Sequence, residues 1–474
     1  MDRSSRARHG RSIRTTARWL LGAALGAAAT SGVALAQESP LQTLVQLRID
    51  GDLSGVCLAA IRIAPGAGGL VADSVTRCAG SARSLPARPG YRFDIGAISK
   101  VFAGVVLAEM VERGEVTLDD PLQTYLPAGI TAPLLDGRAI TLRDLVTHTA
   151  ELPGLPPRLR PVQPRNPYAA ADSAAVHGSL ADIQLEQAPG ARFRDSNWGF
   201  MLLSDALGRR AGKPYDALLR ERVLAPLGMN DTVAGGVSGV LPGLLPGHLP
   251  SGRVTPAWDF PASYAGAGGL RSTPADLAKF ARALLGEFPA SAPATLRAAL
   301  ANAPKKLRDA NRNVALGMAW HRVRLGEHEY VLHHADRGGF SSSLVVDPTN
   351  RTAAIVLADA AGGFEDLALR MIDAGVPLAP PRRTISLDAA AALTLAGRYA
   401  LRPAGVLQVT VADGRLYAQS TGQPRVELLP DSRGDFHAAE FDALLRFTRE
   451  ADGKVSSVSL FQDGGVVHGR RLDD

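Results

Sequence analysis

Several side chains that can take up or release a proton lie in short motifs of this 474-residue sequence: Lys100, Asp195, His333 and His334. A carboxylate paired with a histidine can activate a water for hydrolysis, and a lysine can act as a general base when its pKa is lowered. Metal binding by the two histidines is not expected, because adjacent residues of a strand point to opposite faces.

The elements that position these side chains follow from the spacing of apolar residues. In AISKVFAGVVLAEMVERG they recur every three or four positions up to Gly114, which predicts a helix with Lys100 in its first turn. A second helical region follows Asn197, and Thr273-Pro274 has the residue types of a helix N-cap and first helical position. The two histidines fall in a β-rich region, in which SSSLVVDPTNRTAAIVLADA predicts a hairpin.

Six motifs occur in an order typical of one family: FDIGAISKVFAGVVLAEMVERGEVTLDDPLQTYLP, ITLRDLVTHTAEL, PGARFRDSNWGFMLLSDALG, APLGMNDT, AGAGGLRSTPADLAKF and GGFSSSLVVDP. Residues 50 to 375 resemble the serine β-lactamase and penicillin-binding-protein family, most closely its branch of class C enzymes, D-alanyl-D-alanine carboxypeptidases and esterases. The resemblance implies an α/β (α+β) fold, in which an antiparallel sheet is flanked by helices and accompanied by a helical subdomain. It also implies acyl transfer by a serine.

The first catalytic motif of that family is Ser-x-x-Lys at a helix start, and here the serine position is Ala97. Ser99 is not expected to replace it, because two residues turn a helix by about 200°. Counted from Ser99, the motif would also need a lysine at the position of Phe102. Lys100 is in place, but the nucleophile of the family is lost.

The second family motif, Tyr-x-Asn or Ser-x-Asn, is represented by Asp195-Ser196-Asn197. Asn197 matches, whereas Asp195 replaces the hydroxyl residue. A carboxylate beside Lys100 would favour the protonated lysine. Asp195 is expected either to pair with Lys100 or to be a solvated loop carboxylate or helix cap. The neighbouring motif HTAEL, 148 to 152, departs from the family's His-Thr-Ser-Gly-Leu and is expected to be scaffold.

The third family motif, Lys/His-Thr/Ser-Gly on a strand, is represented by His333-His334-Ala335. His333 fits the first position, but His334 and Ala335 replace the hydroxyl residue and the glycine. A β-carbon at Ala335 is expected to crowd the edge along which a substrate lies. The resemblance implies that the backbone N–H groups of Ala97 and Asp336 could still bind an oxyanion.

Because all three motifs differ from the family while the scaffold remains, we expect a catalytically impaired member. Its cleft would still bind a peptidoglycan-like or other small carbonyl ligand. One alternative is an active β-lactamase, carboxypeptidase or esterase with a different constellation, for example a water activated by Asp195 and a histidine. Another is that the C-terminal segment is the binding module, which deletion of the residues after 384 would test. No cofactor is expected, and the oligomeric state is left open.

The net positive charge of the chain is concentrated at its N-terminus. Of 52 basic and 46 acidic residues, six arginines and one aspartate lie in the first eighteen positions, which leaves 46 and 45. A nucleic-acid partner is therefore not expected. The basic start, the apolar run WLLGAALGAAAT and the sequence ALA at 34 to 36 predict a cleaved signal peptide, residues 1–36, and a periplasmic or extracellular protein. A retained membrane anchor is the alternative, although the run is shorter than a bilayer span.

The only two cysteines, Cys57 and Cys78, lie symmetrically about the turn APGAGG between two β-rich runs. A symmetric hairpin would place them opposite each other, as a disulfide requires. Two free thiols are the alternative.

The chain is expected to contain a β-lactamase-like domain at 37–374, a linker at 375–384 and a smaller domain at 385–474. The last segment has short alternating strands and Asp-Gly turns at 413–414 and 452–453. Such a pattern predicts a small antiparallel β-barrel or sandwich. This segment resembles the lipocalin-like module that often follows domains of this family.

Overall fold

The computed structural model describes residues 39–51, 57–79, 90–159, 165–235, 241–380, 382–401, 405–462 and 465–472. The expected signal segment, 1–36, lies outside the described residues. In the described part of the chain, no helix is both long enough and apolar enough to cross a membrane.

An eight-stranded antiparallel sheet forms the centre of the fold, in the order β10-β11-β12-β13-β14-β15-β1-β2. Its strands are β1 (Cys57–Gly66), β2 (Gly69–Cys78), β10 (Arg308–Asp309), β11 (Val314–Leu316), β12 (His321–Leu325), β13 (His328–Arg337), β14 (Phe340–Asp347) and β15 (Thr352–Ala358). Every residue of β14 and β15 is buried, because both faces of the sheet are covered. These two strands form the expected hairpin.

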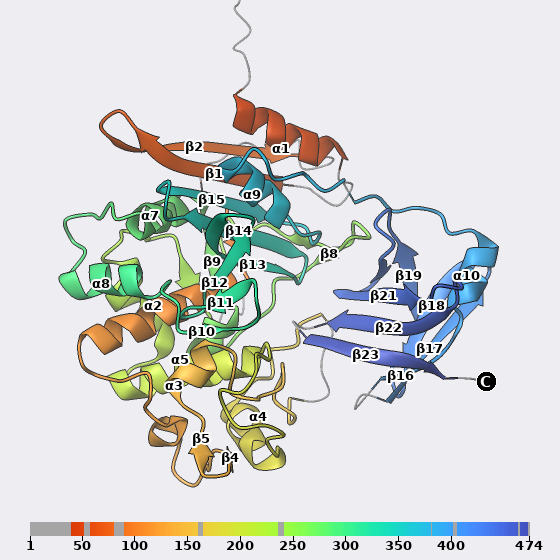
Figure 1. Ribbon diagram of the computed structural model, residues 1–474, viewed down its shortest axis with the longest axis horizontal. Coiled ribbons are helices and arrows are strands. Elements are labelled where there is room, and N and C mark those ends of the chain that lie inside the picture. The colour runs from red at the N-terminus through yellow and green to blue at the C-terminus, as the bar shows by residue number, and fades with distance from the viewer. Residues whose placement is uncertain are drawn as a thin grey trace, which may run out of the picture. The chain divides into compact units, whose positions relative to one another are not determined.

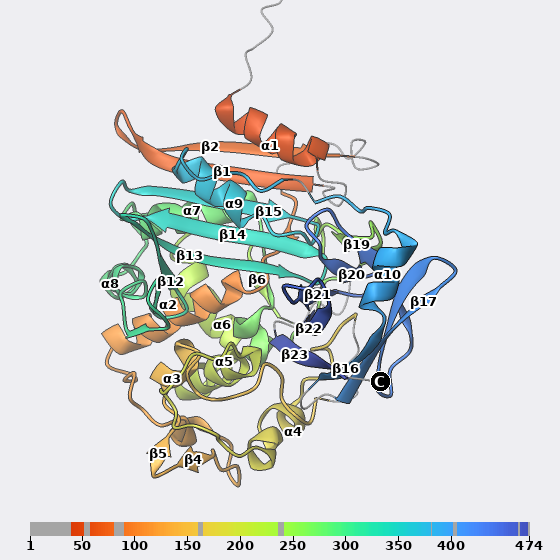
Figure 2. The ribbon, with the colours of Figure 1, turned by 45° about the vertical axis from the view of Figure 1, so that its right-hand side comes forward.

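Helices cover both faces of this sheet (Figures 1 and 2). The helices α1 (Pro40–Gly51) and α9 (Glu365–Ile372) pack on one face through a cluster that includes Val45, Val356 and Leu367. On the other face, α2 (Ile98–Glu112), α7 (Pro274–Leu284) and α8 (Ala294–Asn302) join the main core.

Four more helices belong to the helical part of the same core: α3 (Leu142–Val146), α4 (Ser173–Val176), α5 (Asn197–Ala211) and α6 (Tyr215–Leu219). The 3₁₀ and π turns are η2 (Leu122–Tyr125), η3 (Gly178–Asp182), η4 (Arg220–Leu224) and η5 (Ala262–Ala267). Short strands complete this part: β3 (Phe93–Asp94), β4 (Leu134–Leu135), β5 (Arg138–Ala139), β6 (Val233–Ala234), β7 (Gly247–His248), β8 (Val254–Thr255) and β9 (Leu270–Ser272).

Two predicted helix boundaries are confirmed, the end of α2 and the start of α7. The helix α2 ends just before Gly114, whose φ of 69° lies in the left-handed region that favours glycine. At the start of α7, the Thr273 side chain accepts a hydrogen bond from the Asp276 backbone and Pro274 takes the first helical position. The small sheet β3-β9-β6 leads directly into α2 and therefore fixes where its first turn lies.

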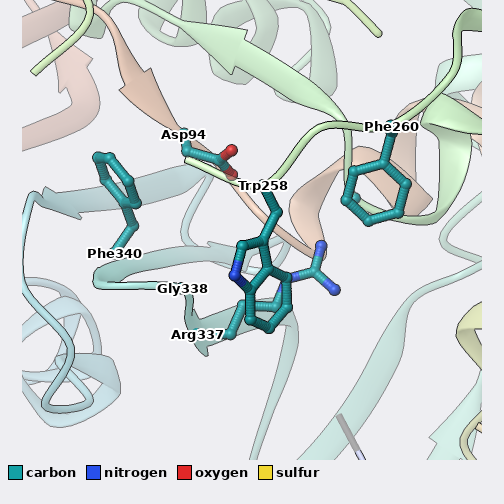
Figure 3. A pocket seen from close by; sticks show the side chains of 7 residues that line it. Asp94, Trp258, Phe260, Arg337, Gly338 and Phe340 are labelled. Carbon is teal, nitrogen blue, oxygen red and sulfur yellow. The ribbon is translucent and has the colours of Figure 1, made fainter. Parts of the chain in front are cut away.

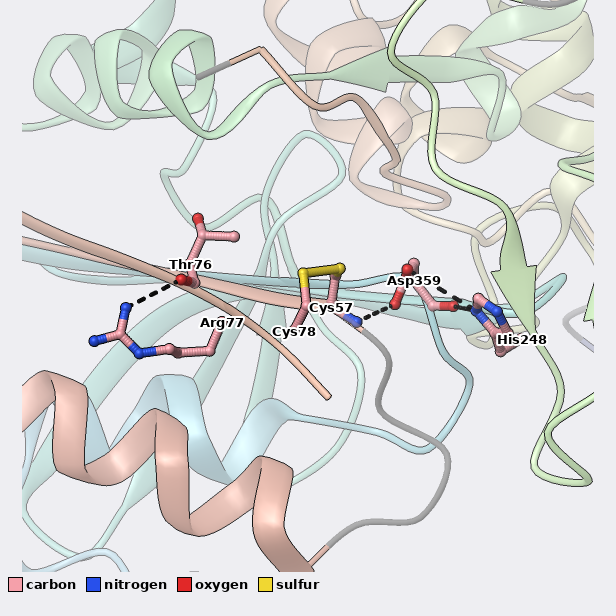
Figure 4. The surroundings of a disulfide bond; sticks show 6 residues. All are labelled: Cys57, Thr76, Arg77, Cys78, His248 and Asp359. Carbon is pink, nitrogen blue, oxygen red and sulfur yellow. Dashed lines mark hydrogen bonds and ion pairs between the residues drawn. A yellow bond between two sulfur atoms is a disulfide. The ribbon is translucent and has the colours of Figure 1, made fainter. Parts of the chain in front are cut away.

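The predicted disulfide between Cys57 and Cys78 is confirmed (Figure 4). The two residues lie directly opposite each other in the β1–β2 register. The backbone N–H of Cys57 donates to Asp359 Oδ1 at 2.6 Å. Burial raises the pKa of the Asp359 carboxyl to about 7.

The C-terminal segment forms the expected small antiparallel barrel, closed by eight strands. They are β16 (Gly397–Leu401), β17 (Gly405–Ala412), β18 (Arg415–Ser420), β19 (Val426–Pro430), β20 (Phe436–Ala438), β21 (Ala443–Arg449), β22 (Val455–Gln462) and β23 (Gly465–Leu472), preceded by α10 (Ala389–Leu395). The predicted Asp413-Gly414 turn joins β17 to β18, and both residues have positive φ. Leu407, Leu428 and Val458 are among the side chains of the barrel core.

Candidate active site

The start of α2 places Ala97 and Lys100 one helical turn apart. Ala97 is the N-cap residue and is partly exposed, whereas Lys100 is only 3% exposed. Gly96 precedes them with a φ of 49°, and its N–H donates to Asp94 Oδ1 at 2.8 Å. A β-carbon on Gly96 would lie 2.7 Å from the β-carbon of Ala335, so the helix start is pressed directly against β13.

Ser99 is part of the scaffold. Its side chain is fully buried, and its hydroxyl accepts a hydrogen bond from the Leu270 backbone N–H at 3.0 Å. This hydroxyl therefore anchors β9 to α2, in agreement with the register that assigns Ala97 to the nucleophile position.

Asp195 forms an ion pair with Lys100, with Nζ and Oδ1 3.1 Å apart. The sequence left open whether Asp195 pairs with Lys100 or is a loop carboxylate or helix cap, and the structure has the ion pair. The N-cap of α5 is instead Ser196, whose hydroxyl accepts a hydrogen bond from the Gly199 N–H. Burial would raise the pKa of Asp195, but the charge of Lys100 and its hydrogen bond lower this pKa below its usual value.

The pKa of Lys100 differs from the expectation that its carboxylate neighbour would dominate. Burial lowers this pKa, and the nearby Arg337 charge adds to that effect, while Asp195 opposes it. The direction is downward because Lys100 is almost completely removed from water.

His148 joins the pair and was not identified as a site residue from the sequence, where its motif was expected to be scaffold. Its Nδ1 accepts the Ser196 backbone N–H at 2.9 Å and lies 3.1 Å from Asp195 Oδ1. The ring is 4% exposed, and burial lowers the pKa of His148 to about 3. The imidazole is therefore neutral at neutral pH.

The two adjacent histidines of β13 lie on opposite faces, as predicted. His333 is buried, and its Nδ1–H donates to the Ala319 carbonyl at 2.7 Å. Its ring stacks on His321, and burial lowers its pKa well below the usual value. His334 is 47% exposed, with Nε2 3.5 Å from Glu365 Oε1. Among the described residues, no group of three or more His, Cys, Asp or Glu side chains is placed to hold a metal ion.

Asn197 is buried at the start of α5, and its Nδ2 donates to the Tyr168 hydroxyl at 2.7 Å. The asparagine of the second family motif is expected to hold the lysine and the substrate. Within the described part of the chain, however, the hydrogen bond of Lys100 goes to Asp195 alone. Asn197 therefore lies in the site with its amide hydrogen-bonded to Tyr168.

The strand β13 has an edge that β12 leaves uncovered. The β12–β13 register ends at the pair His321 and Leu332, so the segment from His333 to Arg337 lies beyond it. The Oδ1 of Asp336 accepts hydrogen bonds from the Ser341 hydroxyl and the Gly362 N–H. The cluster formed by Lys100, Asp195, His148 and His333 together with this edge is the candidate site.

A narrow recess adjoins the start of α2 (Figure 3). It is lined by Asp94, Trp258, Phe260, Gly268, Arg337, Gly338 and Phe340. The Arg337 guanidinium lies between aromatic rings in this recess, an arrangement that the sequence did not indicate because the rings come from other segments.

The sequence pattern of the β-lactamase family matches residues 44–375. The chain belongs to the β-lactamase family. A second pattern, a domain of unknown function called DUF3471, matches residues 381–470. This match covers α10 and the barrel except the last two residues of β23.

Two relatives match this chain over stretches of different length. The D-alanyl-D-alanine-carboxypeptidase/endopeptidase AmpH of Escherichia coli K12 is 36% identical over 138 residues, which make up 29% of this chain and 35% of that protein. The chain thus spans about a third of the length of that relative. Penicillin-binding protein 4* of Bacillus subtilis 168 is 23% identical over 412 residues, 80% of this chain and 87% of that protein.

A solved β-lactamase-family structure has the same fold. It is the β-lactamase/D-alanine carboxypeptidase of Yersinia pestis complexed with citrate, with a TM-score of 0.55 and 22% identity. The similarity covers 68% of this chain and 92% of that one. The predicted β-lactamase-like fold is therefore confirmed.

Proposed function

We propose that this chain is an exported β-lactamase-family protein that has lost acyl transfer and retains its cleft for binding. The observation that carries the proposal is the methyl side chain of Ala97 at the start of α2, one turn before Lys100. The family reaction begins with attack by a serine hydroxyl at this position. A methyl group cannot form the acyl-enzyme.

Neighbouring hydroxyl groups do not take over this role. The Ser99 hydroxyl accepts from Leu270, and the Ser196 hydroxyl donates to the Pro153 carbonyl at 2.7 Å. Lys100 is hydrogen-bonded to Asp195 and to no hydroxyl of the described residues. Lys100 thus has no nucleophile to activate.

A hydrolase that uses Asp195 and a histidine to activate water is less well supported. The histidine that contacts Asp195 is His148, which accepts a backbone N–H through Nδ1 and has a pKa of about 3. An imidazole with so low a pKa is a weak base at neutral pH. Burial also lowers the pKa of His333 well below its usual value, so this imidazole is a weak base as well. These features favour binding over turnover.

The proposed ligand is peptidoglycan-like or another small carbonyl compound. The backbone N–H groups of Ala97 and Asp336 would donate to its carbonyl oxygen. Lys100, Asn197 and His333 would supply polar contacts.

Intact-mass analysis after incubation with a labelled penicillin tests the loss of acyl transfer. We expect no adduct on the native chain and none on Ala97→Ser, because Asp195 still occupies the hydroxyl position of the second motif. Calorimetric titration of the same penicillin measures binding separately, so that failure to bind is distinguished from failure to react. A stable adduct on the native chain would refute the proposal.

A stepwise series identifies which departures matter. The variants are Ala97→Ser with Asp195→Tyr, and the same pair with His334→Thr and Ala335→Gly. We expect labelling to increase along the series. Full labelling of Ala97→Ser alone would show that the second and third motifs are still competent.

Export is supported by the Cys57–Cys78 disulfide, since structural disulfides persist in oxidising compartments. N-terminal sequencing of the mature protein tests the proposed signal peptide, with a start at Gln37 expected. A chain that keeps residues 1–36 and fractionates with membranes would instead support the retained anchor.

A further inference from the structure

A serine, a histidine and a carboxylate form a hydrogen-bonded chain outside the candidate active site. Ser173 Oγ lies 2.9 Å from His177 Nδ1, and His177 Nε2 lies 3.0 Å from Asp205 Oδ2. None of the three residues belongs to the three catalytic motifs of the family pattern. A hydroxyl, an imidazole and a carboxylate linked in this order activate a serine for attack on a carbonyl carbon.

The carboxylate determines which nitrogen of His177 carries the proton. Burial would raise the pKa of Asp205, but hydrogen bonds from His177 and Arg209 lower it below its usual value, so Asp205 is ionised at neutral pH. An ionised carboxylate only accepts hydrogen bonds, so the Nε2–H of His177 donates to it. Nδ1 of the neutral ring then has a lone pair that accepts the Ser173 hydroxyl. The hydroxyl therefore faces a general base.

Two helices that contact each other hold these side chains in place. Ser173 is the first residue of α4 and His177 follows its last, and a spacing of four places both on one face. Asp205 lies on α5, and Trp198 of the same helix donates through Nε1 to the Val176 carbonyl at 2.8 Å. The hydrogen bond ties α4 to the helix that supplies the carboxylate.

The two ends of the hydrogen-bonded chain differ in exposure. His177 is 1% exposed and Asp205 is 8% exposed, whereas Ser173 is at the surface. The Tyr264 ring lies against the imidazole, with ring centres 6.1 Å apart. The base is thus shielded from water, while a molecule in solution can reach the hydroxyl.

A second pair of serine and histidine offers a comparison without the carboxylate. Ser459 Oγ also lies 2.9 Å from an imidazole Nδ1, that of His468, at the surface of the barrel. No carboxylate among the described residues forms an ion pair with this ring. The chain therefore contains its own control for what Asp205 adds to Ser173.

We propose that Ser173 is a second nucleophile of this chain and that it attacks small carboxylic esters. The bond from Oγ to the carbonyl carbon forms, the hydroxyl proton passes to His177 Nδ1, and the alcohol leaves with that proton as its bond to the carbon breaks. Water then hydrolyses the acyl-serine and restores the hydroxyl. Asp205 is a positioning residue, because it orients the ring and stabilises the imidazolium without touching the ester.

The position of the hydroxyl limits the substrate. Because Ser173 lies at the surface, recognition is confined to the ester group itself, which favours small and activated esters. This site does not depend on the proposed loss of acyl transfer, because it shares no residue with the start of α2.

Labelling of the full chain with a fluorophosphonate tests the nucleophile. The reagent bonds its phosphorus to the oxygen of an activated serine and releases fluoride, and peptide mass spectrometry locates the adduct. We expect one adduct, at Ser173, which is absent from Ser173→Ala and retained by Ser459→Ala. No adduct, or an adduct at another serine, would overturn the assignment. The same mapping keeps this result apart from the test of acyl transfer at α2, which concerns the peptide that contains Ala97.

Variants of the other two residues test the activation. His177→Gln should slow labelling by about 100-fold or more, which is the usual contribution of a general base. Asp205→Asn keeps the shape of the side chain but removes the counter-charge of the imidazolium, and should slow labelling by about tenfold or more. The rate of p-nitrophenyl acetate hydrolysis should fall in the same order. Circular dichroism establishes that each variant is folded, and a native labelling rate in either folded variant would refute the activation of Ser173.

Discussion

Lys100 Nζ lies 3.1 Å from Asp195 Oδ1, and the two side chains differ greatly in exposure, at 3% and 42%. The lysine is held inside the first turn of α2, while the carboxylate covers it from the loop before α5. In the family pattern this pair of positions contains a lysine and a hydroxyl residue that exchange a proton with a serine. Here an ammonium and a carboxylate face each other beside Ala97.

Substitution of Asp195 by asparagine should reduce stability. The variant leaves a buried lysine without its counter-charge, and we expect Asp195→Asn to lower the free energy of unfolding by about 1 to 2 kcal/mol. The loss is smaller than for a fully buried pair because Asp195 is partly exposed. Urea unfolding at pH 7 measures it. Asp119→Asn, at the exposed pair with Arg143, is the control and should lose less; equal losses would contradict the prediction.

The buried His148 should make stability depend on pH. Its pKa is about 3 in the folded chain and ordinarily 6.5. Between these values the unfolded chain binds a proton that the folded chain does not, so this stability is present above pH 6.5 and is lost as pH falls toward 3.

His148→Asn removes that titration. Asparagine tolerates the positive φ of this position, and its Oδ1 can accept the Ser196 N–H in place of Nδ1. Between pH 7 and pH 5 the native chain should lose about 2 kcal/mol more stability than the variant. Parallel pH profiles of the unfolding free energy would show that His148 is not responsible.

The local features were predictable from the sequence because they depend on neighbours in the chain, whereas the fold was predicted from the resemblance of six ordered motifs to the family. The helix that carries Lys100, the Cys57–Cys78 bridge and the opposite faces of His333 and His334 follow from periodicity and turn symmetry. The contacts of the site depend instead on loops that meet from distant segments. The spacing along the chain does not show that His148 meets Asp195.

The surroundings of Arg337 illustrate the same limit. Its rings come from Tyr168, Trp258 and Phe260, and the strand β13 brings the arginine to them from far along the chain. Each aromatic residue taken alone has the pattern of an ordinary core side chain. What the sequence lacked was the information that these loops fold over the end of β13.

Close packing of α2 against the main sheet region should make Gly104 sensitive to substitution. A β-carbon there would lie 2.3 Å from the Met318 carbonyl oxygen, which belongs to the backbone and cannot move easily. We expect Gly104→Ala to destabilise the chain by about 1 to 3 kcal/mol despite the higher helix propensity of alanine. Gly199→Ala in α5, where the nearest atom is 3.5 Å away, should show no loss, and thermal unfolding of the two variants gives the comparison. Similar stabilities would refute the packing argument.

Removal of the disulfide should destabilise the fold, because the bridge restricts the conformations of the unfolded chain. The bridged residues are 21 positions apart, and closing a loop of that length contributes about 3 kcal/mol. The double variant Cys57→Ala and Cys78→Ala should lower the free energy of unfolding by this amount under oxidising conditions. Addition of a reductant should bring the native chain close to the variant. A native chain unaffected by complete reduction would contradict the prediction.

The disulfide also gives the molecule a practical property. It uses both cysteines of the sequence, so the oxidised chain offers no sulfhydryl to an alkylating reagent. A cysteine introduced as Ala97→Cys would be a unique attachment point at the start of α2, one turn before Lys100. A single spin label or fluorophore placed there would report on the surroundings of the candidate site without a background from any other position.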